Sequence, residues 1–227
     1  MTENKLHRTA IVDAAIELAD TEGLDALSMR RIADRLGVGA MSLYRHIANK
    51  DELLTAMTDE VARRTPYPSP EGQQWTWRDR VRIAAEIDWA LYRQHPWVLL
   101  TFATPRYSLG PPSLACLTWL VDGFLELEVS TREATNMALT VWNYISGATL
   151  PKISTALMTR KDAHPDGNQL RSPATAAADG SVPLALAELM NNTEGTLPYE
   201  ELLYSGLDAL CDGFEVRAAR HARMTST

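Results

Sequence analysis

Hydrophobic residues recur three and four positions apart along most of this chain, and little of it shows the strict alternation typical of strands. This periodicity predicts a first helix that ends near Gly23, a second that Ser28 caps, and a third that follows a turn at Gly37. A fourth helix is expected from Asn49, whose side chain can form a capping-box pair with Glu52, to about residue 64. The pattern therefore predicts an all-α fold.

Three alternating prolines between residues 65 and 72 interrupt this pattern. Proline lacks a backbone N–H and disfavours a helix, so we expect an extended connector there. The chain then divides into a small N-terminal domain of three or four helices, residues 1–64, and a larger helical domain, residues 65–227.

The larger domain is expected to hold further helices, each marked by an apolar stripe or by an opening proline. They cover about residues 77–94, 96–100, 111–125, 130–157, 183–191 and 199–223. Residues 159–181 lack convincing periodicity and are expected to form a loop. Whether that loop closes over a ligand is left open by the sequence.

Residues 28–50 carry the most specific pattern in the chain. Two short amphipathic segments flank a tight turn, and their apolar residues can close one small core: Ile32, Ala33, Leu36, Val38, Leu43 and Ile47. Polar side chains stay outside that core. This is the layout of a helix-turn-helix, which presents its second helix to the major groove of DNA.

Charge agrees with this interpretation locally. The chain has 22 Lys and Arg against 29 Asp and Glu, but residues 28–50 hold five basic residues and one acid, a balance of +4. Residues 65–227 hold 13 basic and 18 acidic residues, a balance of −5. Phosphate contact is therefore expected only at the N-terminal end.

Other classes of protein receive little support. The only cysteines, Cys116 and Cys211, lie far apart in apolar helical patterns, which favours buried free thiols over a disulfide framework or a metal site. The N-terminus is polar and no apolar run reaches the roughly 18 residues that cross a bilayer, so we expect a cytoplasmic protein with no membrane contact. No nucleophile elbow, phosphate-binding glycine loop or paired metal-ligand motif favours an enzyme, and no cofactor is implied.

Residues 27–38 and 42–54 resemble the DNA-binding domain of the tetracycline-repressor (TetR) family, and the specific resemblance covers about residues 5–60. The larger domain resembles the tetracycline-repressor type of ligand-binding domain in length, helical content and the Arg-Gln-His-Pro-Trp segment at residues 93–97. The resemblance implies an N-terminal helix-turn-helix domain joined to a larger helical domain for ligand binding and dimerisation.

The resemblance also assigns DNA contacts. Tyr44, His46 and Lys50 match positions on the phosphate backbone, where their donors can fix register. The positions that face base edges in family members match Arg30, Gly39, Ala40, Met41, Ser42 and Arg45. Three other interpretations stay open: Tyr44 as a core aromatic, His46 as an ordinary surface histidine, and Arg31 with Arg35 as a solvated face.

For the larger domain we expect a pocket for a mostly apolar, planar molecule, built from aromatic side chains and a few polar groups. The candidates are Trp89, Tyr92, His95, Phe102, Trp119, Met137, Trp142, Asn143 and Tyr144. Ordinary core packing explains any one of these residues, and the hypothesis depends on the cluster. No second histidine accompanies His95 at helical spacing, so no metal is predicted.

Family members pair through two C-terminal helices, which match residues 130–157 and 199–223. Small residues that permit close helix packing, and apolar residues that supply area, are expected to form this interface: Leu203, Gly206, Leu207, Ala209, Leu210, Gly213 and Phe214. A two-fold homodimer would read a palindromic operator.

The sequence thus predicts a ligand-responsive DNA-binding regulator, in the first place a repressor that a small apolar or aromatic molecule releases from a palindromic DNA operator. A regulator controlled by a protein partner is the alternative, and a small helical enzyme is disfavoured. The effector, the operator sequence, the target genes and the choice between repression and activation are not determined by the sequence.

Overall fold

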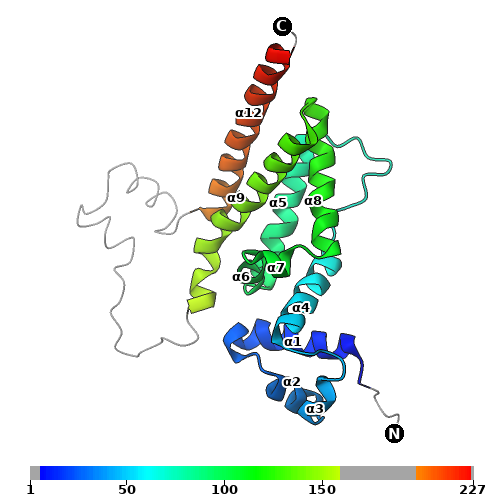
Figure 1. Ribbon diagram of the computed structural model, residues 1–227. Coiled ribbons are helices and arrows are strands. Elements are labelled where there is room, and N and C mark those ends of the chain that lie inside the picture. Colours follow the sequence, from blue (N-terminus) through cyan, green and yellow to red (C-terminus); the bar gives the residue numbers. More distant parts are fainter. Residues whose placement is uncertain (1–5, 159–197, 226–227) are drawn as a thin grey trace, which may run out of the picture.

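Helices and the loops between them account for every described residue of the computed structural model, which covers residues 6–158 and 198–225 (Figure 1). The predicted all-α fold is confirmed within these ranges. The loop expected at 159–181 and the helix expected at 183–191 lie outside the described residues.

The N-terminal helices form a small unit at the lower end of Figure 1, which we call the head. It contains α1 (Arg8–Glu22), a short 3₁₀ helix (Leu24–Ala26), α2 (Met29–Leu36) and α3 (Ala40–Leu43). Ser28 caps α2 by accepting the Arg31 N–H at 3.3 Å, and Gly37 ends it at φ 67°. Ile32, Leu43 and Ile47 are fully buried in the core of the head.

The helix α4 (Lys50–Arg64) connects the head to the rest of the chain. Asn49 caps it as predicted, because its side-chain oxygen accepts the Glu52 N–H at 2.8 Å. The carboxylate of Glu52 accepts from Ala48 at 2.7 Å, one residue before the partner that a capping box requires. Since α4 contacts both α1 and the helices α6, α7 and α8, the domain boundary after residue 64 stays a prediction.

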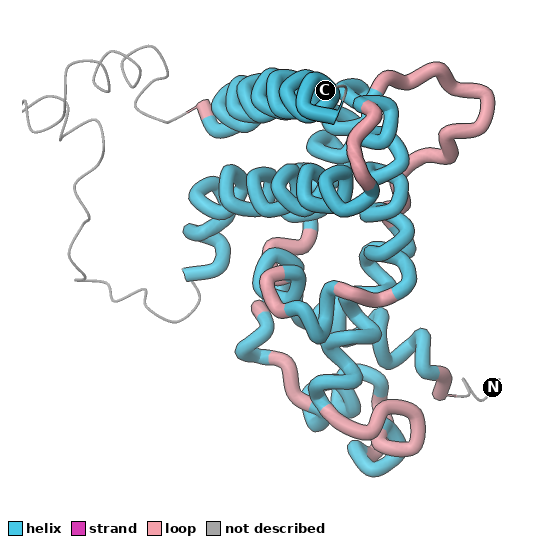
Figure 2. The backbone as a smooth tube through the Cα atoms, turned by 45° about the horizontal axis from the view of Figure 1, so that its top comes forward, coloured by secondary structure: helices cyan, strands magenta, loops and turns pink. Residues whose placement is uncertain are grey.

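We call the remaining helices the body. They are α5 (Trp77–Gln94), α6 (Val98–Phe102), α7 (Pro105–Ser108), α8 (Pro111–Phe124), a 3₁₀ helix (Leu125–Leu127), α9 (Thr131–Met158) and α12 (Tyr199–Thr225). Helices α5, α8, α9 and α12 lie alongside one another, and the connector at residues 65–76 loops out at their edge (Figures 1 and 2). The bounds of α5 match the prediction, because Thr76 and Asp79 form a capping box and Gln94 precedes His95-Pro96.

The inner face of α12 corrects one expectation about dimerisation. Leu203, Leu207 and Phe214 were predicted to supply intersubunit area, but they are buried within their own chain. A Cβ on Gly206 would meet the ring of Tyr144, so this glycine permits close packing of α12 on α9. Other apolar side chains of the two helices are exposed: Leu150, Leu202 and Val216.

Candidate functional site

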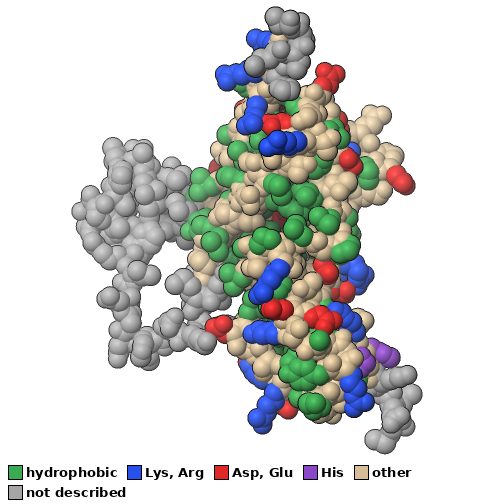
Figure 3. All heavy atoms as spheres, in the orientation of Figure 1, with side chains coloured by type: hydrophobic (Ala, Val, Ile, Leu, Met, Phe, Trp, Pro, Cys, Tyr) green, Lys and Arg blue, Asp and Glu red, His purple; other side chains and the backbone are tan. Residues whose placement is uncertain are grey.

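The helix-turn-helix surface lies at the lower end of the head. There Lys and Arg side chains surround a small apolar patch (Figure 3). Leu43 and Ile47 are fully buried in the core of the head, so residues 44–46 between them point outward. Met41 is 76% exposed and Tyr44 is 46% exposed. Arg30, Gly39, Arg45, His46 and Lys50 are also exposed, and Ala40 and Ser42 are half-buried.

Ion pairs separate two groups of basic residues in the head. Arg31 binds Glu22 at 2.6 Å and Arg35 binds Glu17 at 3.1 Å, so both side chains are held against α1. By contrast, none of the ion pairs of the described residues involves Arg30, Arg45 or Lys50. These three cations are available to phosphate or base atoms.

Gly37 and Gly39 serve the turn in different ways. At φ 67° Gly37 adopts the left-handed conformation that disfavours a side chain. Gly39 has an ordinary extended backbone and caps α3, and a Cβ there would meet nothing within 4 Å. The absence of a side chain at Gly39 leaves the start of α3 open to a close approach by another molecule.

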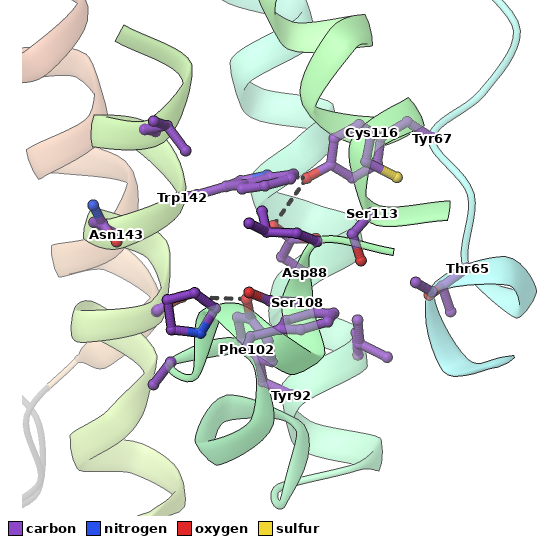
Figure 4. Close-up of a pocket in the computed structure, with 17 residues that line it drawn as sticks. Thr65, Tyr67, Asp88, Tyr92, Phe102, Ser108, Ser113, Cys116, Trp142 and Asn143 are labelled. Carbon is purple, nitrogen blue, oxygen red and sulfur yellow. Dashed lines mark hydrogen bonds between the residues drawn. The ribbon is translucent and has the colours of Figure 1, made fainter. Parts of the chain in front are cut away.

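The body contains a cavity of about 320 Å³ between the end of α4, α5, the α6–α7 segment, α8 and α9 (Figure 4). Its described walls are mostly apolar and aromatic. They consist of Ala62, Thr65, Tyr67, Asp88, Leu91, Tyr92, Phe102, Ala103, Pro105, Ser108, Leu109, Ser113, Cys116, Leu139, Trp142, Asn143 and Ser146. A cavity of this size and composition is typical of a small-molecule site.

A chain of hydrogen bonds crosses the cavity wall from α9 to α5. The indole N–H of Trp142 donates to the Tyr67 hydroxyl at 2.9 Å, and that hydroxyl donates to Oδ2 of Asp88 at 3.0 Å (Figure 4). Because Trp142 occupies an acceptor position of the hydroxyl, the Tyr67 proton is directed to the carboxylate. Elsewhere in the wall, the Tyr92 hydroxyl is 3.2 Å from the Ser146 hydroxyl.

Burial raises the pKa values of the groups around this chain of hydrogen bonds. Desolvation raises the pKa of Asp88 from 3.8 to about 7, against the opposing effect of the Tyr67 hydrogen bond. Desolvation also raises the pKa values of Tyr67, Tyr92 and Cys116, so these three groups are neutral near pH 7. Asp88 is therefore the described wall residue whose charge changes near neutral pH.

Four of the nine predicted ligand residues line the cavity: Tyr92, Phe102, Trp142 and Asn143. The labelled side chain of Asn143 lies apart from the others, toward α12 (Figure 4). The other five candidates lie elsewhere. Trp89 and Met137 are buried in the core, and the Trp119 ring stacks edge-on against Tyr67 at 5.2 Å.

His95 and Tyr144, the other two candidates, make contacts between helices. His95 Nδ1 lies 2.8 Å from Asp20 Oδ1, which also accepts the Trp97 indole N–H at 2.7 Å. The Tyr144 hydroxyl donates to the Leu202 carbonyl at 3.0 Å and so joins α9 to α12.

Tyr67, Asp88 and Cys116 line the cavity and were missed as ligand residues. Tyr67 belongs to the proline-rich stretch, which we interpreted only as a connector. A detectable signal existed for Asp88, because it occupies the buried stripe of α5 with Ala84, Leu91 and Tyr92. A carboxylate in such a stripe is unusual unless it has a partner or a function.

Two polar links join α1 and the first turn of α4 to the α6–α7 segment, which lines the cavity. Asp20 near the end of α1 holds His95 and Trp97, which lie between α5 and α6. Asp51 in the first turn of α4 accepts the Tyr107 hydroxyl at 2.7 Å and lies 3.3 Å from Arg106. Since α7 also lines the cavity, these contacts connect the cavity wall to the residue that follows Lys50.

The described residues contain no group of three or more His, Cys, Asp or Glu side chains that could hold a metal ion. Over the same ranges, no helix combines the length and apolar character needed to cross a membrane.

Two family models match the chain. Residues 11–57 match "Bacterial regulatory proteins, tetR family", and residues 69–218 match "Tetracyclin repressor-like, C-terminal domain". The chain is 33% identical over 214 residues to the HTH-type transcriptional repressor DrrR1 of Streptomyces coeruleorubidus, covering 92% of this chain and 77% of that protein. It is 29% identical over 223 residues to the class D tetracycline repressor protein of Escherichia coli, covering 94% and 91%.

A solved structure gives a similar result. The TetR family protein ActR of Streptomyces coelicolor, in complex with actinorhodin, matches with a TM-score of 0.71 and 25% identity, covering 93% of this chain and 96% of that one. These relatives are described as transcriptional regulators and not as enzymes.

Proposed function

Because this chain belongs to the TetR family of bacterial transcriptional repressors, we propose that it leaves a palindromic operator when a small, largely apolar aromatic molecule enters the body cavity. The observation that carries the proposal is this cavity, walled in part by the end of α4 and by α7, which also binds the start of α4. A cavity between the helices that support the head is suited to couple ligand binding to DNA binding. The ActR complex with actinorhodin supports a small-molecule effector by analogy.

On the DNA side, we propose that Tyr44, His46 and Lys50 bind phosphates. Arg30 and Arg45 are the proposed base readers, with Gly39, Ala40, Met41 and Ser42 packed against base edges. All of these residues are exposed except the half-buried Ala40 and Ser42, and Arg30, Arg45 and Lys50 form no ion pair with the described residues, which supports this assignment. A bidentate arginine–guanine contact contributes about 1–3 kcal/mol of discrimination. Met41, which is highly exposed, is suited to contact a thymine methyl group.

We propose that the homodimer forms through the outer faces of α9 and α12, where Leu150, Leu202 and Val216 are exposed. This revises the interface expected from the sequence, because the inner stripe of α12 is used within the chain. A two-fold dimer of this kind presents two recognition helices about 34–36 Å apart, the spacing of successive major grooves. A ligand that favours another spacing lowers operator affinity.

The mechanism follows from the contacts of α4. Its last turn contributes Ala62 to the cavity, the residue after it contributes Thr65, and its first turn holds Asp51, which binds α7. A molecule that separates α7 from α4 therefore acts on both ends of the helix that carries the head. Coupling free energies between two sites of an allosteric protein are typically roughly 1–3 kcal/mol.

Selection of bound sequences from random duplex DNA, with the purified protein at physiological salt, tests the DNA side. We expect a palindrome whose half-sites lie about 10 base pairs apart, centre to centre. Failure of a folded dimer to enrich any sequence would contradict the proposal. The selected duplex then serves as the probe in a search for molecules that release it.

A further inference from the structure

We propose that the cavity selects a ligand with a protonated amine beside its aromatic or apolar part, and that Oδ1 of Asp88 is the atom that binds the amine. This inference rests on the proposed function, since it names the chemical class that enters the same cavity. It begins from the charge of the walls. Among the described residues that line the cavity, Asp88 is the one acid, and no Lys, Arg or His lies beside it.

Asp88 has one free oxygen. Its Oδ2 accepts the Tyr67 hydroxyl, whereas no described residue hydrogen-bonds Oδ1. The residue is 6% exposed and lines the cavity, so a ligand is the available partner for this atom. An ionised carboxylate with a single neutral donor is costly to bury, and a cation placed against it removes that cost.

The surroundings of Asp88 also favour a cation. The rings of Tyr92, Phe102 and Trp142 line the same cavity, and aromatic faces attract ammonium groups. A carboxylate among aromatic rings therefore offers an amine both an ion pair and cation–π contacts. An anionic ligand would meet no positive side chain among the described wall residues and would be repelled by Asp88.

Three probes that share a naphthalene ring test this inference: naphthylethylamine, naphthylethanol and naphthylacetate, which are cationic, neutral and anionic at pH 8. Isothermal titration calorimetry with the full chain should show the amine binding at least about 10-fold more tightly than the alcohol, equivalent to about 1.4 kcal/mol. The acetate should bind more weakly than both. Alcohol binding as tight as amine binding, or no saturable binding of the amine, would overturn the proposal.

Matched variants assign the preference to Asp88. In Asp88→Asn the ratio of amine to alcohol affinity should fall to within about 2-fold. Asp59→Asn removes another partly buried carboxylate, on α4 and outside the cavity wall, and should keep the wild-type ratio. Tyr67→Phe retains the carboxylate and should keep the preference for the amine. It provides a second measurement in which Asp88 itself is unchanged.

Proton release gives an independent readout. Binding of a cation lowers the pKa of Asp88 from about 7, so at pH 6.5 the amine should expel a fraction of a proton that the alcohol does not. The titratable groups that face Asp88 are Tyr67 from the connector, Tyr92 from α5 and Cys116 from α8. All three are neutral at this pH because their pKa values are raised. Calorimetry in buffers of different ionisation enthalpy measures this proton, and its persistence in Asp88→Asn would contradict the assignment.

The failures of the two proposals are distinguishable. If the amine binds through Asp88 but neither it nor any other cavity ligand changes operator affinity, the ligand class stands and the release mechanism fails. If a neutral molecule releases the operator and Asp88→Asn responds to it like the wild type, the release mechanism stands and the ligand class fails.

Discussion

At the residue scale, the sequence was informative about the head and less so about the cavity. Exposure of Tyr44, Arg45 and Lys50 follows from a short-range pattern, in which buried Leu43 and Ile47 fix the orientation of their neighbours. The cavity wall depends on how several helices rotate against one another. Trp89 and Tyr92 lie on the same helix, yet Tyr92 reaches the cavity and Trp89 packs in the core. Periodicity predicts that both are buried but not what each contacts.

The two kinds of predicted DNA contact can be separated by substitution. Lys50→Ala should weaken binding to operator and random DNA alike and reduce the salt slope by about 1, because a phosphate contact is lost. Arg45→Ala should weaken operator binding preferentially, by about 1–3 kcal/mol. Fluorescence anisotropy over a series of salt concentrations measures both effects. Arg31→Ala, whose side chain pairs with Glu22, is the control, and equal losses on both DNAs for Arg45→Ala would exclude a base reader.

Asp88 should impose its own pH dependence on stability. Because its pKa is about 7 in the folded chain against 3.8 as reference, the folded state holds a proton that the unfolded state has released between about pH 4 and pH 7. The contribution of Asp88 to the free energy of unfolding is thus full below pH 4, falls as pH rises from about 4 to about 7, and stays low above pH 7. Asp88→Asn should nearly match the wild type at pH 4 and exceed it by roughly 4 kcal/mol at pH 8. Urea denaturation at both pH values measures this, and a difference independent of pH would contradict it.

At the element scale, helix bounds with strong local signals could be predicted. The capping box at Thr76 and the proline after His95 define α5, and Pro111 opens α8. The single turn α7 was missed because four residues are too few to show periodicity. The connector was predicted as extended, but its Tyr67 reaches the cavity through tertiary contacts that no local pattern encodes.

The bond between α7 and α4 should carry part of the ligand response. Tyr107→Phe removes the hydroxyl that donates to Asp51 and keeps the buried ring. We expect the effect of a cavity ligand on operator affinity to shrink by about 0.5–2 kcal/mol, with ligand affinity for the free protein nearly unchanged. Operator titrations with and without ligand measure this change. Tyr204→Phe on α12 is the control, and an unaltered response in Tyr107→Phe would rule out this link.

At the scale of the whole molecule, a basic helix-turn-helix at residues 28–50 and an acidic body divide the two tasks of the protein. The charge balance of residues 28–50 and of residues 65–227 could be read from the sequence. The dimer surface could not be read from the sequence, because α12 has apolar residues on two faces. The face with the more regular spacing, Leu203, Leu207 and Phe214, packs within the chain.

The dimer should therefore depend on the outer faces. Val216→Glu places a charge where the side chain is 52% exposed in the single chain, and it should shift the protein toward monomer and weaken operator binding at least about 10-fold. Sedimentation velocity reports the dimer. Leu114→Glu on α8, at a position 42% exposed, should leave the dimer intact, and a dimer that resists Val216→Glu would move the interface elsewhere.

The central claim is that occupancy of the cavity and operator binding oppose each other. The most direct measurement is the anisotropy of a labelled duplex, selected as above, titrated with protein alone and with protein saturated by a cavity ligand. Tryptophan fluorescence, which includes Trp142 in the cavity wall, verifies the saturation. We expect operator affinity to fall about 5- to 150-fold on saturation. Equal operator affinity for the empty and the occupied protein would contradict the account.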